Sequence, residues 1–176
     1  LKTISVTSLL ILISISENPT ILPPKFTSIL LQNLDNKNTL IVECLSECIS
    51  RYLSINPQTF SEVFDRASKG ESISNCILLS SLFMHVNLPV NYINQSFIII
   101  DKMILNPKTT AHAIHSLSSL FLTHQMQLTS LSIATNQFEI LFQAINTTSS
   151  LQPVTLHLMN ECYGCLTNIG TLLSSS

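Results

Sequence analysis

Apolar residues recur at intervals of three and four positions along most of the chain, which is the period of one face of an α-helix. The clearest segments are 41–53, 93–104 and 131–145. One run, Phe97 to Ile100 ("FIII"), has the β-branched content that favours a strand. Its continuation at helical spacing to Ile104 favours a helix there as well. The pattern therefore predicts an all-α fold.

Prolines divide the periodic segments, and each lies just before or at the start of one. A proline costs little at the start of a helix, because its missing N–H has no partner there and its fixed φ already suits the helix. These breaks predict helices at roughly 4–16, 24–35, 38–54, 57–68, 72–87, 90–105, 108–124, 128–146 and 153–173.

A weak internal repeat runs through these helices. Phe60, Phe97 and Phe138 each follow a glutamine shortly after the start of a helix, at steps of about 40 residues. That step is the length of a two-helix HEAT or armadillo unit, whose helix pairs stack to share a core. We therefore expect residues 1–176 to form a single block of an α-solenoid of stacked antiparallel helix pairs, with 1–36 as a partial or divergent unit. An irregular helical bundle is the alternative.

Composition narrows the possible partners. Charged residues make up only 10% of the 176 residues, and the formal net charge is −2 with eight lysines and arginines. Because none of these form a basic run, we expect neither nucleic acid nor an anionic membrane as a partner. The apolar run Leu9 to Ile15 is shorter than a membrane helix requires, so it predicts a buried helix rather than membrane insertion. The chain opens at Leu1 within an apolar pattern, which suggests a fragment of a longer array.

The stretch "NECYGC" contains Cys162 and Cys165 in C-x-x-C spacing, which could be a redox dithiol, half of a metal site, or two packing residues. A reactive dithiol of the thioredoxin type needs a helix N-terminus that follows a strand. Both cysteines instead fall on the apolar face of a predicted helix, which favours packing. Gly164 within that helix suggests a close helix contact or a local bend. The odd count of five cysteines indicates a reducing compartment.

Metal binding and catalysis have few candidate residues. Cys44 and Cys48 share a helix face but lie more than 100 residues before Cys162, so a four-thiolate zinc site is disfavoured. His112 and His115 lie one turn apart, and without the glutamate of an H-E-x-x-H motif they are interpreted as surface or packing residues. We expect no metal and no cofactor.

Neither the acidic pairs nor the glycines of the chain indicate a catalytic site. Glu43 with Glu47, and Glu62 with Asp65, have the spacing of a solvated helix face. The three glycines cannot build a nucleophile elbow or a phosphate-binding loop. The chain is therefore not expected to be an enzyme, and no catalytic residue is assigned. The N-x-[ST] triplets at Asn94 and Asn146 are interpreted as chance matches in a chain rich in Asn, Ser and Thr.

Residues 38–173 resemble a known family. "AHAIHSLSSLF" (111–121), "NQFEILFQAI" (136–145) and "LMNECYGCLTNIGTLL" (158–173) resemble consecutive helices of the HEAT-repeat-containing protein five group of animals and the large clathrin-adaptor accessory protein of yeast. Shared identities include Ala113, His115, Ser116 and Leu117. The sequence departs from the family pattern where a small glycine and an Arg-Tyr pair are replaced by Ser81 and His85-Val86.

The resemblance implies a function in vesicle traffic. The chain would belong to a long cytoplasmic scaffold that associates with a clathrin adaptor complex and its accessory proteins at the trans-Golgi network and endosomes. Its partners would be proteins, together with the flanking repeats of the same chain, and its partner-binding residues are unknown. A generic armadillo or HEAT interaction module, such as a transport receptor segment, is the alternative, and a ladder of exposed Asn or acidic residues on the concave face would favour it. A thiol or zinc enzyme using Cys162 and Cys165 is a third hypothesis.

Overall fold

The computed structural model describes residues 25–124 and, beyond them, 136, 139, 140, 143, 156, 157, 160, 162–164 and 167. All regular structure in these residues is helical, without a strand, so the all-α prediction is confirmed for them. The elements are α2 (Phe26–Leu31), α3 (Thr39–Ile55), the 3-10 helix η2 (Pro57–Thr59), α4 (Phe60–Ser68), α5 (Ile73–His85), α6 (Val90–Leu105) and α7 (Thr110–Thr123). The helix expected at 4–16 lies outside the described residues.

Local sequence determines where the helices begin. The Asn38 side chain accepts a hydrogen bond from the Leu40 N–H at 3.1 Å at the start of α3, and the Ser72 hydroxyl accepts one from Asn75 N–H at 3.2 Å at the start of α5. Such caps satisfy N–H groups that have no partner within the helix. Pro57 begins η2 and Pro89 precedes α6, as the sequence predicts.

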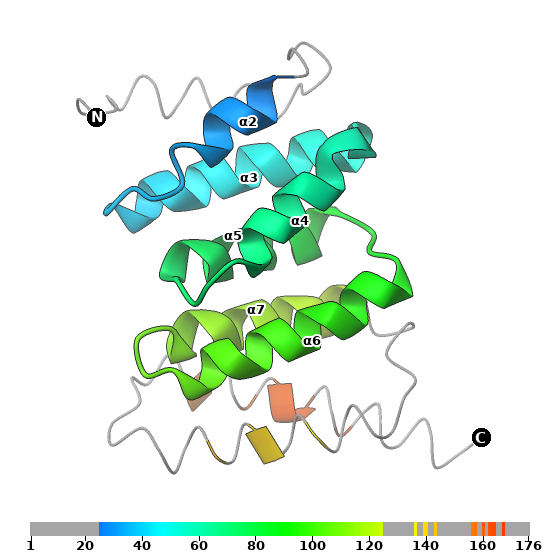
Figure 1. Cartoon of the computed structure of the whole chain (residues 1–176). Helices are drawn as coiled ribbons and strands as arrows, with labels where there is room; N and C mark the ends of the chain where they lie inside the picture. Colours follow the sequence, from blue (N-terminus) through cyan, green and yellow to red (C-terminus); the bar gives the residue numbers. More distant parts are fainter. Residues whose placement is uncertain are drawn as a thin grey trace.

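The helices lie in three successive layers, α2 with α3, α4 with α5, and α6 with α7 (Figure 1). Helix α3 packs against α5, and α5 packs in turn against α7. The apolar faces of all three layers join in one continuous core, which includes Leu45, Leu79 and Phe121. Each layer therefore buries apolar surface that it could not cover alone.

Most hydrogen bonds between layers join residues 31 to 40 positions apart in sequence, although the Cys76–Met103 contact spans 27 and the Cys162–Ile114 contact spans 48. Ser80 and Ser119 share a hydrogen bond of 2.8 Å across 39 residues, and the Ser116 hydroxyl donates to the Cys76 carbonyl at 2.7 Å across 40 residues. Four further bonds have similar separations, namely Glu47–His85 (38), Leu88–His124 (36), Glu71–Asn106 (35) and Asp101–Asn136 (35).

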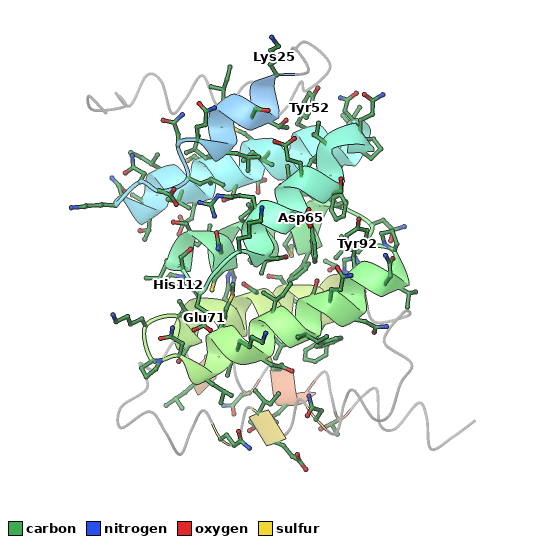
Figure 2. The ribbon with its side chains drawn as sticks, in the orientation of Figure 1. Lys25, Tyr52, Asp65, Glu71, Tyr92 and His112 are labelled. Atoms are coloured by element: carbon green, nitrogen blue, oxygen red, sulfur yellow. The ribbon has the colours of Figure 1, made fainter. Side chains whose placement is uncertain are left out.

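Three aromatic rings join α4 to α6. Phe64 is 2% exposed, and its ring meets Tyr92 with centroids 4.9 Å apart and an interplanar angle of 73°. Phe60 meets the same Tyr92 edge-on, also at 4.9 Å, and Figure 2 labels Tyr92 at this junction. Phe60 therefore contacts Tyr92 in the next layer, whereas Phe97 contacts Phe121 at 6.0 Å. Phe60 and Phe97, which anchor the predicted repeat, therefore do not make equivalent aromatic contacts.

The connection between α4 and α5 is held by the buried side chain of Asn75, which is 1% exposed. Its amide group donates to the carbonyls of Lys69 and Gly70 at 2.8 and 2.9 Å. Its Oδ1 accepts a 2.7 Å hydrogen bond from Arg66, whose guanidinium also reaches Asp35 at 2.6 Å. Gly70 has φ +87°, a conformation that favours glycine at the end of a helix.

Membrane crossing has no support in this part of the chain. Within residues 25–124 and the helical positions after them, no helix combines the length and the apolar character that a bilayer crossing requires.

Candidate functional site

A groove crosses α3, α5 and α7 on one side of the layered helices and has a cavity volume of about 280 Å³. Residues from three separate helices line it. They are Glu43 and Glu47 from α3, Ile77, Ser80, Ser81, Met84 and His85 from α5, and His112 and His115 from α7. Figure 2 labels His112 where α5 and α7 lie next to each other.

Glu47 is the best-connected group in this groove. Its carboxylate accepts hydrogen bonds from Arg51 Nε at 2.6 Å and from His85 Nε2 at 2.8 Å. Burial alone would raise the pKa of the Glu47 carboxyl, but hydrogen bonds from Arg51 and His85 and the positive charges of both outweigh it, so the pKa lies below its ordinary value. Glu47 is therefore ionised at neutral pH.

Ser81 and His85 both point to this carboxylate, with the Ser81 hydroxyl 3.4 Å from Glu47 Oε2. Ser81 and His85 therefore form a polar connection between α3 and α5 that involves Glu47.

The wall contributed by α7 carries two imidazoles. Burial lowers the pKa of His112, nearby His115 lowers it further, and Glu43 acts in the opposite direction. His112 is therefore neutral at neutral pH. His115 Nδ1 lies 3.3 Å from the Ser80 hydroxyl, which is itself bonded to Ser119. This arrangement can accept or donate hydrogen bonds and can attract a cation through the carboxylates.

The cysteines are packing residues wherever the structure describes them. Cys162 is 0% exposed, belongs to the core, and has its Sγ 3.8 Å from the Ile114 carbonyl of α7. Cys165 lies outside the described residues. Cys76 is buried, its Sγ lies 3.4 Å from Met103 Sδ, and burial raises its pKa to about 12. Burial, followed by the charges of Glu43 and Glu47, also raises the pKa of Cys44.

Of the cysteines considered for zinc, Cys162 lies apart from Cys44 and Cys48. Cys44 and Cys48 lie on α3, whereas Cys162 contacts α7, and α5 lies between these helices (Figure 1). Across the described residues, no group of three or more His, Cys, Asp or Glu side chains is arranged to hold a metal ion.

Gly164 does not lie at a close helix contact, which corrects one expectation from the sequence. A Cβ placed on Gly164 meets no heavy atom within 4 Å, and the residue lies in a helical stretch. The neighbouring Cys162 and Tyr163 make the inward contacts of this turn, so the glycine faces open space.

Replacing Gly164 by alanine should therefore stabilise the protein by about 1 kcal/mol, because alanine loses less backbone entropy in a helix. Urea unfolding followed by circular dichroism measures this change. The control is Gly70→Ala, which should destabilise the protein, because φ +87° strains an alanine. A destabilised Gly164→Ala variant would show that a neighbour does restrict this position.

The remaining sequence candidates occupy the surface. Glu62 and Asp65 are exposed on α4, and Asn94 is exposed on α6, while Asn146 lies outside the described residues. Glu43 is exposed, as expected for a solvated helix face, but Glu47 is half-buried by α5. Sequence spacing shows the face that the two glutamates share and cannot show the helix that lies alongside.

His124 is a buried polar residue that the sequence pattern did not single out. It is 4% exposed at the end of α7, and its Nε2 accepts a hydrogen bond from the Leu88 N–H at 3.2 Å. Its Nδ1 lies 2.7 Å from the Thr123 hydroxyl, which donates to the Ser119 carbonyl at 2.8 Å. Nδ1 therefore carries the proton, and the neutral ring joins the start of α6 to the end of α7.

We expect the free energy of unfolding to fall as the pH drops below about 6.5. Burial lowers the pKa of His124 below the usual 6.5, so the unfolded chain binds more protons than the folded chain in this range. His112 acts in the same sense, and Glu47 adds a loss only at lower pH, where its carboxyl protonates. Urea unfolding at pH 7.5 and 5.5 should show the loss, and His124→Gln should reduce it. An unchanged pH dependence in that variant would contradict the assignment.

Comparison with known proteins adds no relative to this picture. No family model, no curated protein and no solved structure matches the chain.

Proposed function

We propose that the chain forms part of an α-solenoid of stacked antiparallel helix pairs, of the HEAT or armadillo kind, and that it serves as a non-catalytic scaffold for binding other proteins. One observation carries the proposal. Most hydrogen bonds between layers join residues 31 to 40 positions apart, although Cys76–Met103 spans 27 and Cys162–Ile114 spans 48, and a separation near the length of one two-helix unit is expected when one unit is laid on the next. An irregular bundle has no reason to place most of these separations near that length.

The stacking also explains why a protein partner is favoured over a small molecule. Successive packing of α3, α5 and α7 creates an extended face, and the groove on it is small, at about 280 Å³. Cofactor and drug-sized ligands occupy pockets of roughly 300–1,000 Å³. A groove at or below the lower limit, open along a row of helices, suits a few side chains of a bound protein.

The specific role that we propose is the one implied by the family resemblance. The chain would support vesicle traffic between the trans-Golgi network and endosomes as part of a cytoplasmic scaffold that contacts a clathrin adaptor complex. A transport-receptor role is less well supported, because the acidic pair Glu43 and Glu47 on α3 is followed on α5 and α7 by Ser, Met and His rather than by a ladder of acidic or Asn residues.

Affinity purification of the tagged protein from its own cells tests this role. We expect clathrin adaptor subunits to co-purify, and the tagged protein to colocalise with them on trans-Golgi and endosomal membranes. The matched control is the same purification after destabilisation of the stack by Phe64→Ala. Purification of the wild type without adaptor subunits, together with a distribution unrelated to these membranes, would rule out the trafficking role.

A further inference from the structure

We infer that the groove across α3, α5 and α7 binds a segment of a partner protein that presents a lysine or arginine next to an aliphatic side chain. This inference rests on the proposed scaffold function and specifies the chemistry of the partner. It follows from the shape of the groove, from its charge, and from the helices that build it.

Two apolar side chains line the groove, and one of them is exposed. Met84 is 50% exposed, and Ile77, which is 9% exposed, lies about two turns earlier on the same helix. An exposed methionine adapts its shape to different aliphatic partners. The volume of about 280 Å³ accommodates the apolar stem of one or two side chains.

The groove contains one carboxylate that its own lining does not balance. Glu43 and Glu47 contribute two carboxylates, and no lysine or arginine lines the groove among the described residues. Arg51 and His85 bind Glu47, whereas the exposed Glu43 carboxylate has no hydrogen-bond or ion-pair partner within the described part of the chain. Glu43 is therefore available to a cationic group of a partner.

The apolar residues and the Glu43 carboxylate line the same groove. Lysine and arginine have an aliphatic stem that packs on apolar surface and a charged end that reaches a carboxylate. With the stem on Ile77 and Met84, the charged end can approach the α3 wall at Glu43. Neutral His112 on the opposite wall offers hydrogen bonds without repelling the cation.

A pair of peptides tests the inference directly on the whole chain. The first is a short fluorescein-labelled peptide in which arginine alternates with leucine, and the second has every arginine replaced by the neutral isostere citrulline. Fluorescence anisotropy should show about tenfold tighter binding of the arginine peptide. Equal affinity for the two peptides would overturn the inference, because the carboxylates would then contribute nothing.

Matched charge reversals locate the binding surface. Glu43→Lys should weaken binding of the arginine peptide about tenfold, whereas Glu62→Lys, which makes the same change at an exposed position on α4, should change it less than about twofold. Both positions are exposed, so neither variant should unfold. Equal weakening by the two variants would show non-specific attraction to an acidic protein and would contradict binding in the groove.

The pH dependence of peptide binding provides an independent test. The titratable and charged groups around the cation position come from all three helices and are Glu43, Cys44, Glu47, Arg51, His85, His112 and His115. Protonation of His112 in acid adds positive charge near Glu43. Binding of the arginine peptide should therefore weaken from pH 7.5 to 5.5, and less so in a His112→Gln variant. Tighter binding in acid would contradict the model of a cation at Glu43.

Other occupants give different results. If a second copy of the chain fills the groove, Glu43→Lys will abolish self-association in analytical ultracentrifugation while the wild type ignores the arginine peptide, and the inference fails. If Glu43→Lys still captures adaptor subunits and the wild type binds neither peptide, the inferred binding site is wrong, and the proposed scaffold function is still supported. If the wild type binds the arginine peptide through Glu43 but captures no adaptor, the inferred binding site is supported and the trafficking role is wrong.

Discussion

Replacing Phe64 by alanine should lower the free energy of unfolding by about 4 kcal/mol, the largest effect we expect from a single substitution. The ring is 2% exposed and contacts Tyr92 in the next layer at 4.9 Å and Phe60 at 5.8 Å. Alanine removes buried apolar area, leaves a cavity between α4 and α6, and eliminates two aromatic contacts. Urea unfolding of the whole chain, followed by circular dichroism, measures the loss.

Two controls separate cavity formation from a general sensitivity of the helices. Phe64→Leu keeps most of the apolar volume and should cost about 1.5 kcal/mol or less. Ile98→Ala removes a side chain that is 60% exposed on α6, and it should change stability by less than about 0.5 kcal/mol. If Phe64→Ala costs no more than Ile98→Ala, the contact between α4 and α6 is absent in solution.

Replacing Asn75 by leucine should cost about 3 kcal/mol, although leucine has a similar volume and is a better helix former. The buried amide makes three hydrogen bonds, two to the carbonyls of Lys69 and Gly70 and one from Arg66. Leucine would leave these carbonyls and the guanidinium without that partner, in a position that water reaches poorly. The melting temperature and the urea midpoint should both fall.

A double-mutant cycle tests the connection between Asn75 and Arg66. Once Arg66→Met has removed the guanidinium, Asn75→Leu should cost about 1 kcal/mol less than it does in the wild type. Asn94→Leu, on the exposed face of α6, should be nearly neutral and serves as the matched substitution. Additive losses in the cycle would show that the two side chains act independently.

The limits of the helices could be predicted closely, because they are set by residues near each end of the helix. The expected ranges 38–54, 72–87 and 90–105 match α3, α5 and α6, which span Thr39–Ile55, Ile73–His85 and Val90–Leu105. Caps and prolines set these limits through contacts a few residues apart, which a sequence displays directly. The shorter α2 is the main difference, since it ends at Leu31 rather than near 35 and continues as turns.

The candidate site could not be predicted in the same way. Glu47, His85 and His112 each have an ordinary helical context, and only the packing of α3 on α5 and of α5 on α7 brings them to one groove. The buried roles of Asn75 and His124 depend on the same tertiary contacts. Cys162 differs from these, because its place on the apolar face of its helix is local information, and it is buried in the core as expected.

The short reach of the hydrogen bonds between layers has a mechanical consequence. Each of those bonds reaches only the neighbouring layer, so tension applied along the stack loads the contacts one after another rather than all together. Small openings at successive contacts then add up to a large extension at low force. Such a body would behave as a spring that can follow a curved or moving surface without unfolding.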